Sequence, residues 1–201
     1  MCAFLRVRWT ITPLIPPQPW IACSSCGGPR PFQSSGRIRL NANGKRLDAW
    51  LIYKCLSCDK TWNRPLFERR NRGDIDAATL DALHFSEPGW VRMREFDVDD
   101  LRRRAQRIEE FADMEISKEV LERVEDRAAG MEIELRVVLP ASLRLDRLLA
   151  TELGLSRSRL DVLQAAGRLR IDPERKDGLR RRVRDRMRIA LDDPHIMDTR
   201  P

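Results

Sequence analysis

Four cysteines in the first third of the chain have the spacing of a metal site. Cys23 and Cys26 form one Cys-x-x-Cys pair, and Cys55 and Cys58 form a second. Two thiolates three residues apart can face one point from a tight turn, and a second pair opposite the first completes a tetrahedral set of four sulfur ligands. Zn²⁺ favours this geometry, with Zn–S distances of about 2.3 Å. We therefore predict that these four cysteines bind one structural Zn²⁺.

The four cysteines are also compatible with a pair of disulfides, a rubredoxin-like iron site or free thiols. The N-terminal apolar run stops at Arg6 and is followed by four prolines, so it does not have the pattern of a secretory signal. We expect a cytoplasmic chain, in which thiols stay reduced and paired Cys-x-x-Cys motifs favour a metal. Because the protein supplies all four ligands, no position is left for a substrate or an activated water.

The residues between the two cysteine pairs have the pattern of a β-hairpin. Strand-like segments at 37–40 and 47–54 flank Asn43-Gly44, which is a strong signal for a tight hairpin turn. Gly27 and Gly28 follow the first pair, where a tight turn needs backbone freedom. This is the layout of a zinc ribbon, and we expect residues 1–72 to form a zinc-ribbon domain that includes a strand at 4–11.

The middle of the chain has a helical pattern, and we expect a helical segment over residues 73–130. Three aspartate or serine caps would begin its helices. The first predicted helix begins at Asp74 or Asp76, runs to Leu83 and is closed by Pro88-Gly89. The other two are 97–111, begun by Asp97, and 117–130, begun by Ser117. The arginines at 102–104 and 107 are typical of a solvated helix face.

The last quarter of the chain contains all of its net positive charge. The chain has a formal net charge of +7, and residues 144–191 contain fourteen basic and seven acidic side chains. Such an asymmetry is typical of a nucleic-acid-binding module. Apolar periodicity predicts strands at 132–139, 168–171 and 183–189, with helices at 143–153 and 156–167 between them.

This C-terminal segment resembles the S-four-type RNA-binding domain of ribosomal proteins and pseudouridine synthases. The resemblance rests on Arg144-Leu145-Asp146, Ser156-Arg157 and Gly167-Arg168, at the spacing of that family. It implies two helices packed on a small sheet over residues 131–191, followed by a tail at 192–201. It also implies contacts with RNA, for which the candidate residues are Arg144, Arg157, Arg159, Arg168 and Arg170. The start of the second helix suits phosphate binding.

The order of elements along the whole chain also resembles an uncharacterised bacterial family, domain of unknown function 1062. The shared features are the Cys23–Cys58 segment, the turn Asn41–Asp48 and the run Cys58–Trp62. This resemblance implies no biochemical activity.

These observations predict an α+β protein that binds zinc and nucleic acid, RNA in preference to DNA, and is not an enzyme. The chain has only two histidines and lacks a nucleophile elbow and a P-loop. No apolar stretch approaches the ~20 residues of a membrane span. The alternatives are a helix-turn-helix DNA-binding regulator, with residues 148–169 as the motif, and a zinc-ribbon adaptor for other proteins. The RNA target and the oligomeric state stay open.

Overall fold

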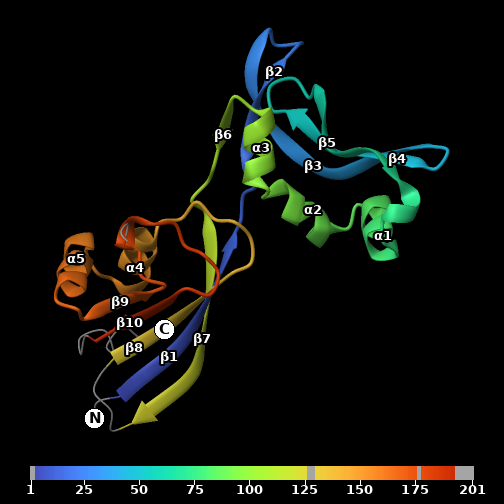
Figure 1. The fold of residues 1–201 in the computed structure, drawn as a ribbon. Coiled ribbons are helices and arrows are strands. Elements are labelled where there is room, and N and C mark those ends of the chain that lie inside the picture. Colours follow the sequence, from blue (N-terminus) through green and yellow to red (C-terminus); the bar gives the residue numbers. More distant parts are fainter. Residues whose placement is uncertain (1–2, 126–129, 176–177, 193–201) are drawn as a thin grey trace. The chain divides into compact units, whose positions relative to one another are not determined.

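The computed structural model describes residues 3–125, 130–175 and 178–192, so Cys2, His195 and the expected tail beyond Asp192 lie outside it. The chain forms two compact units (Figure 1). The inserted unit is residues 15–111, and the terminal unit combines the described parts of 1–14 and 112–201. This division differs from the expected boundaries at residues 72, 130 and 191, because the first strand pairs with strands from the C-terminal half.

The terminal unit is built on a five-stranded sheet. Its strand order is β7 (Met114–Glu125), β1 (Ala3–Pro13), β8 (Gly130–Val137), β10 (Arg188–Leu191) and β9 (Leu169–Asp172). Strands β1 and β8 are parallel, and the other neighbours are antiparallel. The long connection between β1 and β8 contains the whole inserted unit, which explains how two units arise from one chain.

Strand β1 has the alternation that its sequence predicts. Trp9 is buried in the core, whereas Arg6 and Arg8 lie on the opposite face of the sheet. There Arg6 pairs with Glu132 of β8 at 3.4 Å, and Arg8 pairs with Glu134 at 3.6 Å. This face of the sheet is therefore covered by paired charges, and the core lies on the other face.

Two helices form the core with the buried face of this sheet. Helix α4 (Leu145–Leu153) ends at Gly154, whose φ of +64° suits glycine, and α5 (Arg157–Ala165) begins at Ser156. The Ser156 Oγ accepts a hydrogen bond from the backbone N–H of Arg159 at 3.1 Å. The structure thus confirms the two helices predicted at 143–153 and 156–167. The helix residues buried in the core are Leu145, Leu148, Leu149, Leu153, Leu160 and Leu163.

The inserted unit contains an antiparallel sheet in the order β5 (Thr61–Asn71), β4 (Arg46–Cys55), β3 (Gly28–Asn43), β2 (Gln18–Cys23) and β6 (Arg107–Glu109). The predicted hairpin is confirmed, because Asn43 of β3 pairs with Arg46 of β4. The turn between them contains Gly44, with a φ of +59°. A short 3₁₀ helix, η1 (Arg72–Asp74), follows β5.

Three short helices follow, α1 (Ala77–Phe85), α2 (Pro88–Glu95) and α3 (Val98–Arg104). Of the two predicted caps, Asp76 is the one that begins α1, accepting the backbone N–H of Thr79 at 2.8 Å, whereas Asp74 lies in η1. Pro88, which was expected only to close the preceding helix, is the first residue of α2. Proline is tolerated at this position because the first N–H of a helix has no partner within the helix. Helices α1 and α2 contact β3.

The predicted helix at 97–111 is wrong beyond Arg104. Residues 107–109 form β6 instead, whose backbone pairs with β2. Trp20 of β2 holds this pairing, because its Nε1 donates to the Glu109 carboxylate at 3.2 Å and the Arg107 guanidinium lies 4.8 Å from its ring centroid. The pairing of β6 with β2 and these side-chain contacts thus outweigh the helical spacing of the apolar residues at 97–111.

The predicted helix at 117–130 is also wrong in its described part, because Met114–Glu125 is strand β7. Its pairing with β1 is interrupted by a bulge between Arg6 and Val7, opposite Leu121. A bulge adds one residue and shifts the alternation of side chains. The apolar residues then fall at a spacing that resembles a helix. The last residues of the expected helix, 126–129, lie outside the described residues.

The predicted closing strand at 183–189 is right only at its end, because β10 covers Arg188–Leu191. Before it, η2 (Gly178–Arg180) leads into a segment that runs beside the start of α4. There Arg182 forms a β-bridge with Arg144, and the Val183 N–H bonds to the Leu143 carbonyl at 2.9 Å. None of the helices in the described residues is long and apolar enough to span a membrane.

Candidate metal centre and basic surface

The four predicted ligand cysteines lie together in the inserted unit. Their sulfur atoms are all within 4.8 Å of one another, and the Sγ atoms of Cys23 and Cys58 are 3.5 Å apart. A tetrahedral ZnS₄ centre with bonds of about 2.3 Å has S···S separations of about 3.8 Å. The donor set therefore fits a closed four-coordinate metal site.

Two equivalent turns position the ligands. The Gly27 N–H donates to the Cys23 carbonyl at 3.0 Å, and the Asp59 N–H donates to the Cys55 carbonyl at 2.9 Å. Gly27 and Asp59 occupy the same place in the two turns, and both have positive φ angles, +71° and +58°. Glycine suits this conformation and aspartate tolerates it, so both sequences can form the same turn.

The cluster is continuous with the core of the inserted unit. Cys23 and Cys55 are buried and pack with Phe32 and Tyr53, whereas Cys58 is exposed. Trp62 lies beside the same group, with its ring centroid 5.3 Å from that of Tyr53. A metal held by these thiols would thus connect the two turns to an aromatic core.

Without a metal, the thiols differ in acidity. Burial raises the pKa of Cys23, but hydrogen bonds from the Cys26 backbone and from the Cys58 side chain outweigh it and lower this pKa to about 7. The hydrogen bond with Cys58, followed by burial, raises the pKa of Cys26 to about 12. A metal ion must displace the Cys26 proton to bind four thiolates.

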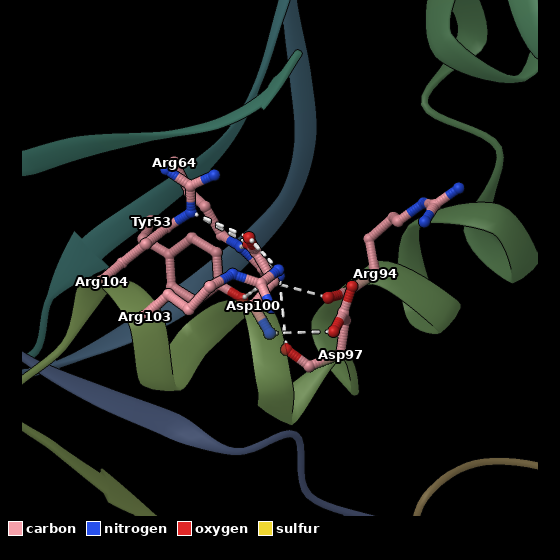
Figure 2. Close-up of polar contacts among 7 residues, drawn as sticks. All are labelled: Tyr53, Arg64, Arg94, Asp97, Asp100, Arg103 and Arg104. Carbon is pink, nitrogen blue, oxygen red and sulfur yellow. Dashed lines mark hydrogen bonds and ion pairs between the residues drawn. The ribbon is translucent and has the colours of Figure 1, made fainter.

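A buried arginine, which the sequence analysis missed, connects the sheet of this unit to its helices (Figure 2). Arg64 of β5 is 1% exposed, and its Nε and Nη2 both lie 2.8 Å from Oδ2 of Asp100 in α3. Its Nη1 donates to the Tyr53 hydroxyl at 3.2 Å and to the Arg94 carbonyl at 2.8 Å. No local spacing signals these contacts, because Asp100 lies 36 residues from Arg64.

One carboxylate, that of Asp100, contacts three guanidinium groups here, those of Arg64, Arg103 and Arg104. Burial raises the pKa of Asp100, but hydrogen bonds from Arg104 and Arg64 outweigh it and hold this pKa below its usual value. Burial also raises the pKa of Tyr53 to about 12, despite the adjacent Arg64, so its hydroxyl is protonated at neutral pH. The group is therefore a charged contact inside the unit, and its arrangement indicates a structural role.

The five predicted RNA-binding arginines all lie in the terminal unit, in two groups. Arg144 and Arg157 both face Asp146. Arg144 makes a two-point contact with it at 3.0 and 2.7 Å, and the Arg157 Nε lies 3.9 Å from it. Arg159 is in the first turn of α5 and exposed, close to Arg157 in the same turn.

The second group lies at β9 and the end of β10. The Arg168 Nε donates to the Asp192 carbonyl at 2.8 Å, and Arg170 pairs with the Asp192 carboxylate at 2.9 Å. Arg144 and Arg170 are thus engaged by carboxylates of the unit itself. The side chain of Arg157 is 62% exposed, and its Nε lies 3.9 Å from the Asp146 carboxylate. The start of α5 is therefore the more accessible of the two basic groups.

Comparison with known protein families gives a match over most of the chain. Residues 40–175, more than half of the chain, match the family described as "Protein of unknown function (DUF1062)". The chain belongs to the DUF1062 family. No curated protein and no solved structure matches it.

The DUF1062 match spans parts of both units. It includes the second cysteine pair and the five predicted RNA-binding arginines, and it begins after the first cysteine pair. Membership confirms the family resemblance seen in the sequence, and it assigns no activity.

Proposed function

We propose that this DUF1062 protein binds structured RNA through its terminal unit and holds one structural Zn²⁺ in its inserted unit. The proposal of RNA binding rests on the arginines at the start of α5. Arg157 and Arg159 are exposed there, in the first turn of the helix and at its positive dipole end. Phosphate groups bind such helix ends, and guanidinium groups add charge-assisted hydrogen bonds.

The helices α4 and α5 with β8, β9 and β10 support the S-four-like interpretation of residues 131–191. Both helices pack against the sheet, and strand β8 precedes them. A helix-turn-helix module needs a third helix beneath the pair. Among the described residues of the terminal unit, α4 and α5 are the only α-helices. This arrangement favours RNA over the DNA-binding alternative.

Zinc is the metal that best suits the cysteine cluster. Four thiolates in a tetrahedral arrangement favour Zn²⁺ or an iron–sulfur centre, and two paired turns at the end of β-hairpins are the ribbon arrangement in which zinc is structural. With four sulfur ligands, the ion has no open position for chemistry. We assign it a structural role, in which it fixes the two turns against the aromatic core.

Zinc affinity should fall as the pH falls. The proton on Cys26, whose pKa is about 12, must leave when zinc binds. In the neutral pH range, this thiol alone therefore weakens the affinity for zinc about tenfold for each unit by which the pH falls. Between pH 8 and pH 6 we expect a loss of at least about a hundredfold. Competition with a chromophoric chelator measures this, and an affinity that stays constant over the range would contradict the thiolate site.

RNA binding should depend strongly on Arg157 and Arg159. The double variant Arg157→Glu/Arg159→Glu removes two guanidinium groups and adds two carboxylates beside the phosphates, so we expect affinity for a structured RNA to fall by at least about a hundredfold at moderate salt. Fluorescence anisotropy with a labelled RNA hairpin measures the dissociation constant.

The matched control reverses two exposed arginines in the inserted unit, Arg102→Glu/Arg103→Glu. It changes the net charge of the chain by the same amount, and both side chains are more than half exposed. We expect a loss of less than about fivefold. Equal losses in the two double variants would leave only a generic electrostatic attraction and would sink the assignment of the α5 start.

A further inference from the structure

The terminal unit contains a pocket lined mostly by arginines that the sequence analysis did not select. Its volume is about 270 Å³, and it lies in the connection from β9 to β10. The residues that line it are Pro173, Arg175, Arg181, Arg182, Arg184, Asp185 and Met187. Four guanidinium-bearing side chains therefore surround one small space, with a single acidic residue among them.

Two of these arginines have side chains that are available to a ligand. Arg175 and Arg184 are exposed, and within the described residues neither has an ion-pair partner. Arg181 differs, because it is 8% exposed and its Nη1 donates to the Pro173 carbonyl at 2.6 Å. That contact places a buried guanidinium group at the pocket.

The acidic residue of the pocket is already engaged. Asp185 accepts the backbone N–H of Val137 through Oδ1 at 2.9 Å, and its Oδ2 lies 3.7 Å from the Nε of Arg186. Its carboxylate therefore ties the segment before β10 to the end of β8, and its charge is shared with an arginine outside the pocket. The formal charges of the residues that line the pocket sum to +3.

One residue that lines the pocket, Arg182, is linked to the group of arginines at the start of α5. Arg182 forms a backbone bridge with Arg144, so the two side chains are cross-strand neighbours. Arg144 in turn shares Asp146 with Arg157 at the start of α5. A chain of charged residues thus connects the pocket to that helix end.

We propose that this arginine pocket binds a phosphate group. Several guanidinium groups that converge on one space match the oxygen atoms of a phosphate, to which arginine donates paired, charge-assisted hydrogen bonds. The phosphate belongs either to the bound RNA, in which case the proposal rests on the function proposed above, or to a small phosphorylated molecule. The recognition chemistry is the same for both sources, and separate measurements of inorganic phosphate binding and of RNA binding distinguish them.

The test uses the zinc-loaded full chain and inorganic phosphate as the probe. Titration calorimetry at constant ionic strength, with chloride as the reference anion, measures phosphate binding. We expect phosphate to bind the unmodified chain at least tenfold more tightly than chloride. Arg175→Gln/Arg184→Gln should weaken phosphate binding at least tenfold, because both side chains are exposed and their loss should leave the fold intact.

The control is Arg180→Gln, an exposed arginine of the same segment that does not line the pocket. It should leave phosphate binding within about twofold. Circular dichroism of all variants verifies that the terminal unit is folded.

A second arm measures binding of an RNA hairpin at several salt concentrations. If the pocket holds an RNA phosphate, the double variant should reduce the slope of log affinity against log salt by about one to two. If RNA binding is unchanged while inorganic phosphate binding is lost, the ligand is a small phosphorylated molecule. Phosphate binding by a chain that does not bind RNA would defeat the proposed function and leave the pocket assignment standing. Phosphate that binds no better than chloride, or equally well to the double variant, overturns the assignment.

Discussion

Replacing Cys55 with serine should remove the metal and unfold the inserted unit. Cys55 is fully buried in the core beside Tyr53, and its sulfur is one of four within 4.8 Å of one another. Structural zinc contributes about 10–16 kcal/mol to small zinc domains, which is as large as the whole stability of a typical domain, about 5–15 kcal/mol. The inserted unit should not keep its fold without this contribution.

Two measurements test the prediction for Cys55→Ser. Metal analysis should give about one zinc per unmodified chain and almost none for Cys55→Ser. Near-ultraviolet circular dichroism should lose most of its signal, because four of the five tryptophans belong to the inserted unit, Trp20, Trp50, Trp62 and Trp90. The control Cys2→Ser should keep its zinc and its signal. Full strand and helix content in a reduced, metal-free chain would show that the metal is not needed for folding.

Replacing Arg64 with methionine should destabilise the inserted unit by about 3–5 kcal/mol. The substitution keeps most of the volume, but it removes the hydrogen bond to the buried Tyr53 hydroxyl and one of the donors to the Arg94 carbonyl. It also removes a partner of Asp100 at 2.8 Å. Losing one partner of a buried ion pair costs this amount because the remaining polar groups stay away from water.

The matched control is Arg103→Met, because Arg103 contacts the same carboxylate at 3.1 Å but its side chain is 69% exposed. A surface ion pair of this kind contributes less than about 1 kcal/mol. Urea unfolding followed by tryptophan fluorescence gives both free energies of unfolding. Similar small changes for the two variants would show that the contacts in Figure 2 do not hold the helices to the sheet.

Local chemical signals predicted much of the candidate site and of the fold. The cysteine spacing identified the cluster because ligand geometry within each turn depends on only a few neighbouring residues. The same holds for the ends of helices, where Ser156 caps α5, Asp76 caps α1 and Gly154 ends α4. At each of these positions the residue type and the backbone conformation determine each other.

Long-range pairing could not be predicted from local patterns. Strand β1 pairs with β7 and β8, more than a hundred residues along the chain, so the first strand belongs with the C-terminal half. The bulge opposite Leu121 produced a helix-like spacing in β7, and the pairing of Ile108 with Pro19 ended the expected helix after α3. In each case a sheet edge supplied backbone partners that outweighed local preference.

The contacts of the basic residues could not be predicted from the sequence either. Charge composition located the positive module, but it could not separate arginines that pair within the unit from those that face solvent. Arg170 is held by Asp192, whereas Arg184 lies free of ion pairs, among the described residues, at the edge of a pocket. Only the folded arrangement distinguishes the two.

The affinity of the zinc-loaded chain for a structured RNA, compared with a DNA duplex of equal length, is the most direct test of the central proposal. At about 150 mM salt, non-specific attraction to phosphates is weak, so recognition by a defined surface should dominate the difference. We expect the RNA to bind at least tenfold more tightly than the duplex, with both affinities measured by the same competition assay. Equal affinity for the two polymers would contradict RNA binding by the terminal unit.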